Sequence, residues 1–276
     1  MFSGTNCSKI YLCTNRRCGQ IQHDMDTIYI NKFLKKGYIT NIYRVCGVLS
    51  FIHILRADML DTSILTFKPT VSRSQSRSGI SYSAGQFGYL SWRSPGLPKQ
   101  EHPFSFLSSP TDKNISLGIK NLGDYTNSIN SIPPESIARI NGGFGNFIPD
   151  YDKGNVCLIG SGIGIVPIVS LIRDMRTNPP MNNVDAFLSV NNRDELLAES
   201  DLLATAEAVP LLTLHVYVYQ EDGVLCSEEL LTSILSSPQN YSYYICSSPN
   251  VRKILLGALS KLSVKKKQIF FEAFTY

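Results

Sequence analysis

Three glycines follow a short apolar run near the middle of the chain, within the stretch Cys157 to Pro167. Glycine lets a phosphate approach the backbone closely, and the N-terminal N–H groups and dipole of a helix attract anions. The apolar run predicts a strand, and the residues after the glycines predict an amphipathic helix. We therefore expect Gly160, Gly162 and Gly164 to bind the phosphates of a nucleotide. Because the spacing departs from the dinucleotide fingerprint, whose third glycine comes one place later, a tight packing turn is the alternative.

The composition is that of an ordinary folded protein, since 43% of the 276 residues are hydrophobic and 17% are charged. This length suffices for two domains, each with its own core. The longest uncharged apolar stretch, Val45 to Leu55, is too short to span a bilayer, and residues 1–19 lack the apolar segment of a signal peptide. These features predict a soluble, cytoplasmic protein.

The cysteines and the charges exclude several classes of protein. Seven cysteines without a pairing pattern argue against a disulfide framework. The spacing of Cys7, Cys13 and Cys18, with His23 behind them, fits neither a zinc nor an iron–sulfur site, so we expect no metal. Residues 1–150 carry 16 Lys and Arg against 9 Asp and Glu, which suits an anionic cofactor, an acidic partner or a lipid surface. No basic run interleaved with aromatic residues indicates nucleic-acid binding.

The first part of the chain is rich in strand signals. Residues 1–40 show no sustained period and are expected to be weakly ordered or a short helical lead-in. Short runs of branched and aromatic residues, separated by turn residues, then predict an antiparallel β-barrel domain over residues 41–150. The strands are expected at Val45–Leu55, Ile64–Phe67, Gln86–Trp92, Phe104–Leu107 and Ile115–Leu122.

Residues 151–276 alternate strand and helix signals with short connections. This alternation predicts an α/β domain with a doubly wound parallel sheet. Ligands of such sheets bind at the carboxyl ends of the strands, where the glycine turn and the stretch Cys246 to Pro249 are expected. Strands are expected at Asn155–Ser161, Asp185–Val190, Leu212–Tyr219, Tyr241–Cys246 and Gln268–Phe274, and helices at Ile165–Met175, Arg193–Ala208, Ser227–Ser236 and Asn250–Leu262.

Several motifs, taken in their order, resemble the ferredoxin-NADP reductase superfamily over about Tyr43 to Tyr276. The glycine turn resembles its pyridine-nucleotide loop Gly-x-Gly-Ile-Gly-x-Thr-Pro, with Val166 in place of Thr. His102-Pro103-Phe104-Ser105 is similar to the flavin motif in the form found in ferric reductases and NADPH oxidases. The other matching pieces are Ala84-Gly85-Gln86-Phe87, Leu122-Gly123-Asp124-Tyr125-Thr126, Cys246-Ser247-Ser248-Pro249 and Phe271-Glu272-Ala273-Phe274.

The resemblance implies a bound FAD in the barrel domain. A flavin needs an aromatic wall, a hydroxyl or amide near its reacting N5 nitrogen and donors for its pyrophosphate. By resemblance, Phe104 lies against the flavin ring, Ser105 hydrogen-bonds N5, and His102 and Thr126 hold the phosphates. A core aromatic and a turn hydroxyl are the alternatives for Phe104 and Ser105. The implied FAD set is His102, Pro103, Phe104, Ser105, Gly123, Tyr125 and Thr126.

The resemblance also implies a site for NADPH, with NADH as the alternative, in the α/β domain. Cys246 and Glu272 would flank the nicotinamide, although a buried strand cysteine is the alternative for Cys246. Phe274 would cover the flavin, with Tyr276 as a competing candidate. Arg193 lies where this family often binds the 2′-phosphate of NADPH. The implied nucleotide set is Gly160, Gly162, Ile163, Gly164, Pro167, Arg193, Cys246, Pro249 and Phe274, and the catalytic set is Ser105, Cys246, Glu272 and Phe274.

The implied activity is hydride transfer from NAD(P)H to FAD, followed by transfer of single electrons to a partner protein, a haem or a ferric chelate. In the NADPH oxidase branch this catalytic half normally follows membrane helices that bind haem. A place at the cytoplasmic face of a membrane, beside a membrane-embedded partner, is therefore an alternative to the cytoplasm. Two other functions stay open. They are a reductase of free flavin and, because of Val166, Ser247 and Ser248, an interaction module that binds nucleotide without turnover.

Overall fold

The computed structural model describes most of the second half of the chain and parts of the first. The described residues are 10–14, 17–21, 62–67, 80–92, 97–129, 132, 136, 138–222 and 228–272, the first three ranges by their backbone alone. The chain divides into two compact units, Met1–Leu60 and Asp61–Tyr276.

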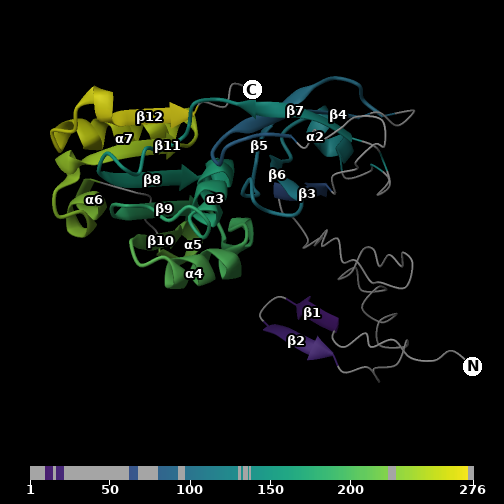
Figure 1. Ribbon diagram of the computed structural model, residues 1–276, viewed down its shortest axis with the longest axis horizontal. Helices are drawn as coiled ribbons and strands as arrows, with labels where there is room; N and C mark the ends of the chain where they lie inside the picture. The colour runs from purple at the N-terminus through teal and green to yellow at the C-terminus, as the bar shows by residue number, and fades with distance from the viewer. Residues whose placement is uncertain are drawn as a thin grey trace, which may run out of the picture. The chain divides into compact units, whose positions relative to one another are not determined.

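The first unit contains an antiparallel strand pair, drawn in purple in Figure 1. β1 (Ile10–Thr14) pairs with β2 (Arg17–Ile21). These ten positions form strands instead of the short helical lead-in, which was one of the two expectations for residues 1–40; weak order of this segment stays a prediction. Strands this short leave too few residues for a period to be recognised in the sequence.

Two antiparallel sheets form the first part of the second unit, which we call the antiparallel half. β3 pairs with β6, and β4 lies between β5 and β7 (Figure 1). The sequence predicts four of these strands to within a few residues but misses β7, whose glycines and polar residues hide the strand pattern. The predicted strand Val45–Leu55 lies outside the described residues. The bounds are β3 (Thr62–Phe67), β4 (Phe87–Trp92), β5 (His102–Ser105), β6 (Ile115–Lys120) and β7 (Ala138–Phe144).

An aromatic and aliphatic core fills the antiparallel half. Phe106, directly after β5, is fully buried and stacks on Tyr82 with 3.9 Å between ring centroids. The short helix α2 (Asp124–Ile129) follows β6 and buries Ile129 against the same core. The buried members of this core are Leu90, Trp92, Phe106, Leu117, Ile119 and Ile129.

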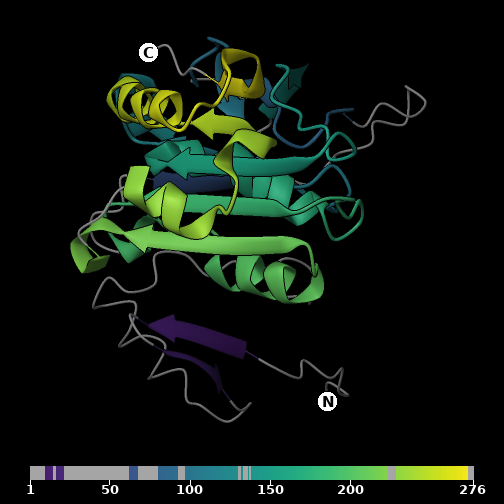
Figure 2. The ribbon, with the colours of Figure 1, turned by 90° about the vertical axis from the view of Figure 1, so that its left-hand side faces the viewer.

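Five parallel strands form the sheet of the remaining part of the second unit, which we call the α/β half. Their order is β10-β9-β8-β11-β12, so the direction of winding reverses between β8 and β11. Figure 2 shows these strands side by side. Every residue of β9 is buried, as expected for a strand covered on both faces. The bounds are β8 (Asn155–Ser161), β9 (Val184–Val190), β10 (Leu212–Val218), β11 (Tyr241–Cys246) and β12 (Ile269–Glu272).

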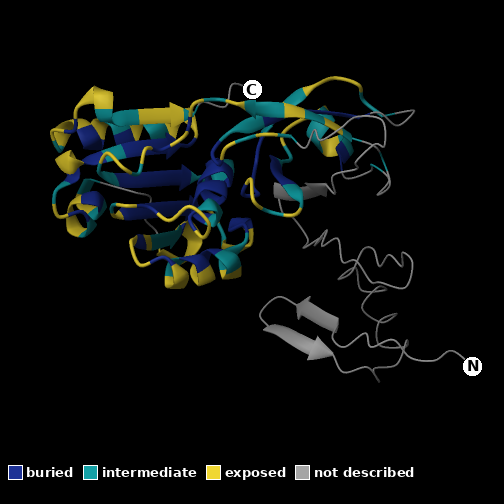
Figure 3. Ribbon diagram, viewed as in Figure 1, coloured by how far each residue is buried: buried dark blue, intermediate teal, exposed yellow. Residues whose placement is uncertain are grey.

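Helices cover both faces of the parallel sheet and create two cores. One core joins the sheet to α3 and α4, and the other joins it to α6 and α7. Figure 3 shows the buried residues concentrated in the central strands and in α3. Within the described ranges, no helix has the length and apolar character needed to cross a bilayer. The bounds are α3 (Ile165–Asp174), α4 (Glu199–Ala208), α5 (Tyr219–Asp222), α6 (Glu228–Ile234) and α7 (Pro249–Lys261).

The predicted helix Arg193–Ala208 is wrong in its first turns. A single 3₁₀ turn, η2 (Arg193–Glu195), is followed by an irregular stretch, and the helix itself begins at Glu199. Ala198 has a left-handed backbone with φ of 57°, which no helix interior allows. The Glu195 carboxylate accepts a hydrogen bond from the Asn191 N–H at 3.1 Å and so stabilises the separate turn.

Candidate functional site

The glycine turn connects β8 to α3 through a 3₁₀ turn, η1 (Gly162–Gly164). A Cβ atom at Gly160 would lie 2.8 Å from the Ile165 Cα, and one at Gly164 would lie 2.0 Å from the Cys246 carbonyl oxygen. These two glycines are required by packing. Gly162 has a positive φ of 56°, and a Cβ there would meet no atom within 4 Å. Both interpretations of the glycines therefore apply, with packing at two positions and an open backbone at Gly162.

A cavity of about 300 Å³ opens beside the glycine turn. It lies at the carboxyl ends of β8, β9 and β11, where the strand order reverses and where doubly wound sheets bind their ligands. Lys120 and Leu122 reach it from the end of β6, so both halves of the second unit line it. The lining residues are Lys120, Leu122, Ser161, Gly162, Ile163, Ser189, Val190, Asn191, Ser247, Ser248, Pro249 and Val251.

The polar groups of this cavity suit an anionic nucleotide. Ser189 is only 4% exposed, and its buried hydroxyl has no hydrogen-bond partner in the structure. An unpaired buried hydroxyl costs stability, so this one has its donor and both acceptor positions left for a further hydrogen bond. Lys120 supplies the single charged side chain among the lining residues. The Ser248 hydroxyl caps α7 by accepting a bond from the Val251 N–H, so a second helix begins at the cavity.

Three of the predicted FAD residues form one aromatic cluster in the antiparallel half. The rings of His102 and Tyr125 stack with 3.7 Å between centroids, and Phe104 lies 6.3 Å from Tyr125 in a nearly parallel plane. All three side chains are half-buried rather than enclosed in the core. Burial lowers the pKa of His102 and raises the pKa of Tyr125. The cluster can offer a flat aromatic surface and a titratable cation.

Two predicted hydroxyls have different surroundings. Ser105 is 4% exposed at the end of β5 and pairs in register with Phe87. The Thr126 hydroxyl accepts bonds from the N–H groups of Leu122 and Gly123, at 2.9 and 3.0 Å, and donates to the Gly123 carbonyl. Thr126 therefore holds together the turn before α2, in which Gly123 is exposed. Its contact with a phosphate stays a prediction.

Cys246 and Glu272 lie side by side as the last residues of β11 and β12. The Cys246 side chain is fully buried, and burial raises the pKa of its thiol well above the usual value. Glu272 is half-buried, which raises the pKa of its carboxyl. The residues directly after Cys246 line the cavity, while Cys246 itself lies behind them. Phe274 and Tyr276 lie outside the described residues.

Arg193 and the start of α3 make contacts that the sequence does not indicate. The exposed Arg193 guanidinium pairs with the carboxylates of Glu199 and Glu221, which raise its pKa further. Val166 and Pro167 are buried in the first turn of α3. A Cβ atom at Gly118, in β6, would lie 2.3 Å from a methyl group of Val166, so the Val in place of Thr packs between the two halves.

Sequence reasoning missed Lys120, Ser189 and Asn191 as cavity residues. Ser189 and Asn191 lie at the carboxyl end of β9, so the same rule that singles out the glycine turn could have found them. Lys120 comes from the other half of the molecule. No spacing in the sequence connects it to the glycine turn.

Comparisons with known proteins find relatives by sequence and by structure. The profile of a family described as an FAD-binding domain matches residues 51–146. Respiratory burst oxidase homolog protein D of Arabidopsis thaliana is 31% identical over 139 residues, which is 41% of this chain and 15% of that protein. The ferredoxin–NAD(P)(+) reductase component of a naphthalene 1,2-dioxygenase/salicylate 5-hydroxylase system of Ralstonia is 21% identical over 206 residues, 71% of this chain and 61% of that one.

A solved structure shares the fold. The flavohemoglobin of Malassezia yamatoensis, determined with bound FAD and heme, superposes with a TM-score of 0.64 at 20% identity, over 78% of this chain and 56% of its own. The superposed part of this chain is longer than either half of the second unit, so the shared fold includes residues of both halves. The chain spans about 15% of the plant oxidase that it matches. The predicted two-part fold, with antiparallel strands before a parallel sheet, is confirmed.

Proposed function

We propose that this chain passes a hydride from NAD(P)H to FAD. We place it in the ferredoxin-NADP reductase superfamily, close to the part of the NADPH oxidases that binds flavin. The observation that carries this proposal is the cavity at the strand reversal, which adjoins an FAD-binding domain and contains the unpaired Ser189 hydroxyl. FAD, when bound, accepts the two electrons of the hydride together and releases them singly. The protein has to bind both cofactors, hold them in contact and exclude water.

The α/β half would bind the nucleotide mainly through its backbone. The open Gly162 and the start of α3 offer N–H groups and a positive helix end to the pyrophosphate. Ile163 and Pro249 would border the nucleotide, since both line the cavity. Lys120 would attract the phosphates. Ser189 would donate its free hydroxyl to the nucleotide.

The antiparallel half would bind FAD through side chains. We assign Phe104 to the flavin face, Ser105 to N5 and His102 to the pyrophosphate, with Tyr125 behind the His102 ring. Pro103, Gly123 and Thr126 complete this set. We also propose that the two antiparallel sheets close into a barrel, and that the FAD-binding and nucleotide-binding domains extend over residues 41–150 and 151–276, after an N-terminal segment of 40 residues.

Cys246 and Glu272, the last residues of β11 and β12, would flank the nicotinamide. Burial raises the pKa of the Cys246 thiol and of the Glu272 carboxyl, which disfavours negative charge beside the place where hydride moves. We assign the cover of the second flavin face to Phe274, which follows β12. Arg193 is the candidate for the 2′-phosphate of NADPH, although Glu199 and Glu221 now neutralise it. NADPH is the proposed donor, with NADH as the alternative.

The electrons would leave one at a time for a haem, a ferric chelate or a partner protein. The plant relative is an oxidase, and the Ralstonia relative is the ferredoxin–NAD(P)(+) reductase component of a dioxygenase/hydroxylase system. We propose a place at the cytoplasmic face of a membrane, beside a membrane-embedded acceptor, with the cytoplasm as the alternative.

Anaerobic stopped-flow mixing of the purified chain, loaded with FAD, with NADPH or NADH tests this function. We expect the visible flavin absorbance to disappear, faster with NADPH. If FAD is reduced but separates from the protein during gel filtration, the chain would be a reductase of free flavin instead. Nucleotide binding without any loss of absorbance would contradict the proposal and favour the interaction module.

A further inference from the structure

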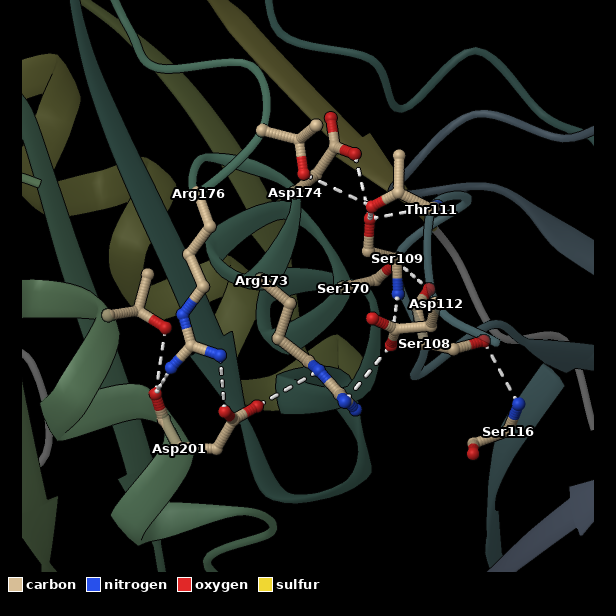
Figure 4. A network of polar contacts seen from close by, with 12 residues as sticks. Ser108, Ser109, Thr111, Asp112, Ser116, Ser170, Arg173, Asp174, Arg176 and Asp201 are labelled. Carbon is tan, nitrogen blue, oxygen red and sulfur yellow. Dashed lines mark hydrogen bonds and ion pairs between the residues drawn. The ribbon is translucent and has the colours of Figure 1, made fainter. Parts of the chain in front are cut away.

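β5, which carries residues that we assign to the flavin, continues into a loop. This loop is hydrogen-bonded to α3, the helix that follows the glycine turn (Figure 4). We propose that these bonds, which we call the lobe clamp, position the glycine turn relative to the flavin strand and so set the distance for hydride transfer. This inference rests on the function proposed above. The lobe clamp consists of Ser108, Ser109 and Asp112 in the loop and Ser170, Arg173 and Asp174 in α3.

Two hydrogen bonds between serines and the opposite half form the buried part of the lobe clamp. The Ser170 hydroxyl donates to the Ser108 carbonyl at 2.7 Å, and the Ser109 hydroxyl donates to the Asp174 carboxylate at 2.8 Å. Ser108, Ser109 and Ser170 are at most 1% exposed. Short hydrogen bonds shielded from water are strong and directional, so they fix an orientation that apolar contact alone leaves adjustable.

An ion pair forms the outer part of the lobe clamp. The Arg173 guanidinium lies 3.0 Å from the Asp112 carboxylate of the loop and 3.0 Å from the Asp201 carboxylate of α4. Asp112 also accepts a bond from the Ser109 N–H at 3.0 Å, which holds its carboxylate in place. Because the Arg173 side chain is only 24% exposed, solvent weakens this pair less than an ordinary surface pair.

The loop is equally well fixed to the antiparallel half. The Ser116 N–H of β6 donates to the Ser108 hydroxyl at 2.9 Å, as Figure 4 shows. The Tyr82 hydroxyl lies 2.8 Å from the Ser108 hydroxyl and donates to the Ser109 carbonyl at 2.9 Å. Burial raises the pKa of Tyr82 to about 12, which keeps this donor protonated. A displacement of α3 is therefore transmitted to β5 and β6.

The lobe clamp connects the two elements whose relative position matters for the proposed reaction. β5 ends at Ser105, a few residues before Ser108, and α3 begins directly after the glycine turn. Gly118 and Val166 meet beside it without room for an extra Cβ atom. A misplacement of about 1 Å in reacting groups can slow a reaction about a hundredfold, so the precision of this contact has a kinetic consequence.

A second ion pair provides a matched control for the lobe clamp. Arg176 pairs with Asp201 at 2.6 Å, and both residues belong to the α/β half. Arg176→Ala therefore removes an ion pair just after α3 that makes no bond to the antiparallel half, although its partner Asp201 also pairs with Arg173. Asp112→Asn removes the charge that faces Arg173 but keeps an oxygen for the Ser109 N–H. Ser170→Ala removes the buried donor.

The first experiment measures hydrogen–deuterium exchange of the full chain without FAD or nucleotide. In the double variant Ser170→Ala/Asp112→Asn we expect faster exchange in residues 108–112 and in α3, and no such change there in Arg176→Ala. Equal exchange in the double variant and the wild type would overturn the lobe clamp. Because no cofactor is present, this result does not depend on the proposed function.

The second experiment measures flavin reduction over a range of NADPH concentrations. For the double variant we expect the limiting rate constant to fall about tenfold, with the nucleotide Kd changed less than about twofold. The long-wavelength charge-transfer absorbance between nicotinamide and flavin should weaken in parallel. The variant Ser170→Ala/Asp112→Glu, in which a carboxylate again faces Arg173, should recover part of the limiting rate constant that the double variant loses. A rate equal to that of Arg176→Ala, or a loss confined to Kd, would overturn the proposal, whereas no reduction by the wild type would refute the function instead.

Discussion

The two halves of the second unit differ in how they would bind a cofactor. In the α/β half the site consists of backbone and helix ends at the carboxyl edge of a sheet, and Gly162 contributes no side chain at all. In the antiparallel half it consists of stacked rings, those of His102, Phe104 and Tyr125. Topology alone locates the first site, whereas the second depends on the identity of a few residues. Substitutions at the glycines that are required by packing should therefore act through the fold, and substitutions of the stacked rings should act through cofactor affinity.

The largest effect is expected from Gly164→Ala. Its Cβ atom would lie 2.0 Å from the Cys246 carbonyl oxygen, so α3 or β11 has to move. We expect a loss of about 3 kcal/mol or more in the free energy of unfolding, measured by urea denaturation.

Gly162→Ala is the matched control. The new Cβ atom meets open space, and the positive φ costs only about 1 kcal/mol. The free energy of nucleotide binding should change more than the free energy of unfolding, because the added methyl group would lie where the phosphates are proposed to bind. Equal destabilisation by both substitutions would contradict the division between packing glycines and an open glycine.

His102→Ala should weaken FAD binding by about 2 kcal/mol, or about thirtyfold. The substitution removes both the ring stacked on Tyr125 and the group assigned to the pyrophosphate. Titration of the apoprotein with FAD, followed by flavin fluorescence, measures the change. The NADPH Kd should stay the same, and an equal loss for both cofactors would refute the division of work between the halves.

Ser189→Ala should weaken nucleotide binding by about 1.4 kcal/mol, or about tenfold. Because the hydroxyl has no partner in the protein, the free energy of unfolding should stay the same or increase. Calorimetric titration with NADP⁺ and urea denaturation together check this prediction. A loss of stability without a loss of affinity would show that the hydroxyl serves the fold.

The smallest effect is expected from pH. Burial lowers the pKa of His102 in the free protein, and a bound phosphate would raise it again by favouring the charged ring. FAD binding then takes up a proton, so affinity is highest below the pKa of His102 in the free protein and falls severalfold as pH rises from there through the higher pKa of the complex. FAD titrations between about pH 5.5 and 8 measure this slope. The slope should disappear in His102→Gln, and an unchanged slope there would assign it to another group.

The sequence predicts the α/β half better than the antiparallel half. Long buried apolar runs, as in β8 and β9, predict strands. The order of these strands in the sheet then determines where the cavity lies. β7 is different, because its glycines approach other chain segments. A Cβ atom at Gly142 would lie 2.8 Å from the Gly88 Cα, a reason for glycine that appears only in three dimensions.

Parts of the site were likewise beyond sequence reasoning. The motif around Thr126 predicts a phosphate turn but not that its hydroxyl is engaged in the turn itself. Arg193 has its carboxylate partners six and 28 positions away, too far apart for a helix pattern to reveal. Lys120 reaches the cavity from the other half. Contacts between distant segments decide all three cases.

The burial of Cys246 bears on how this residue would be protected from oxidants formed by the proposed reaction. The thiolate, rather than the thiol, reacts with peroxides and alkylating reagents. With no exposed surface and a raised pKa, Cys246 stays a thiol at neutral pH. A flavoprotein that leaks electrons to dioxygen would thus leave this residue unoxidised while it remains folded.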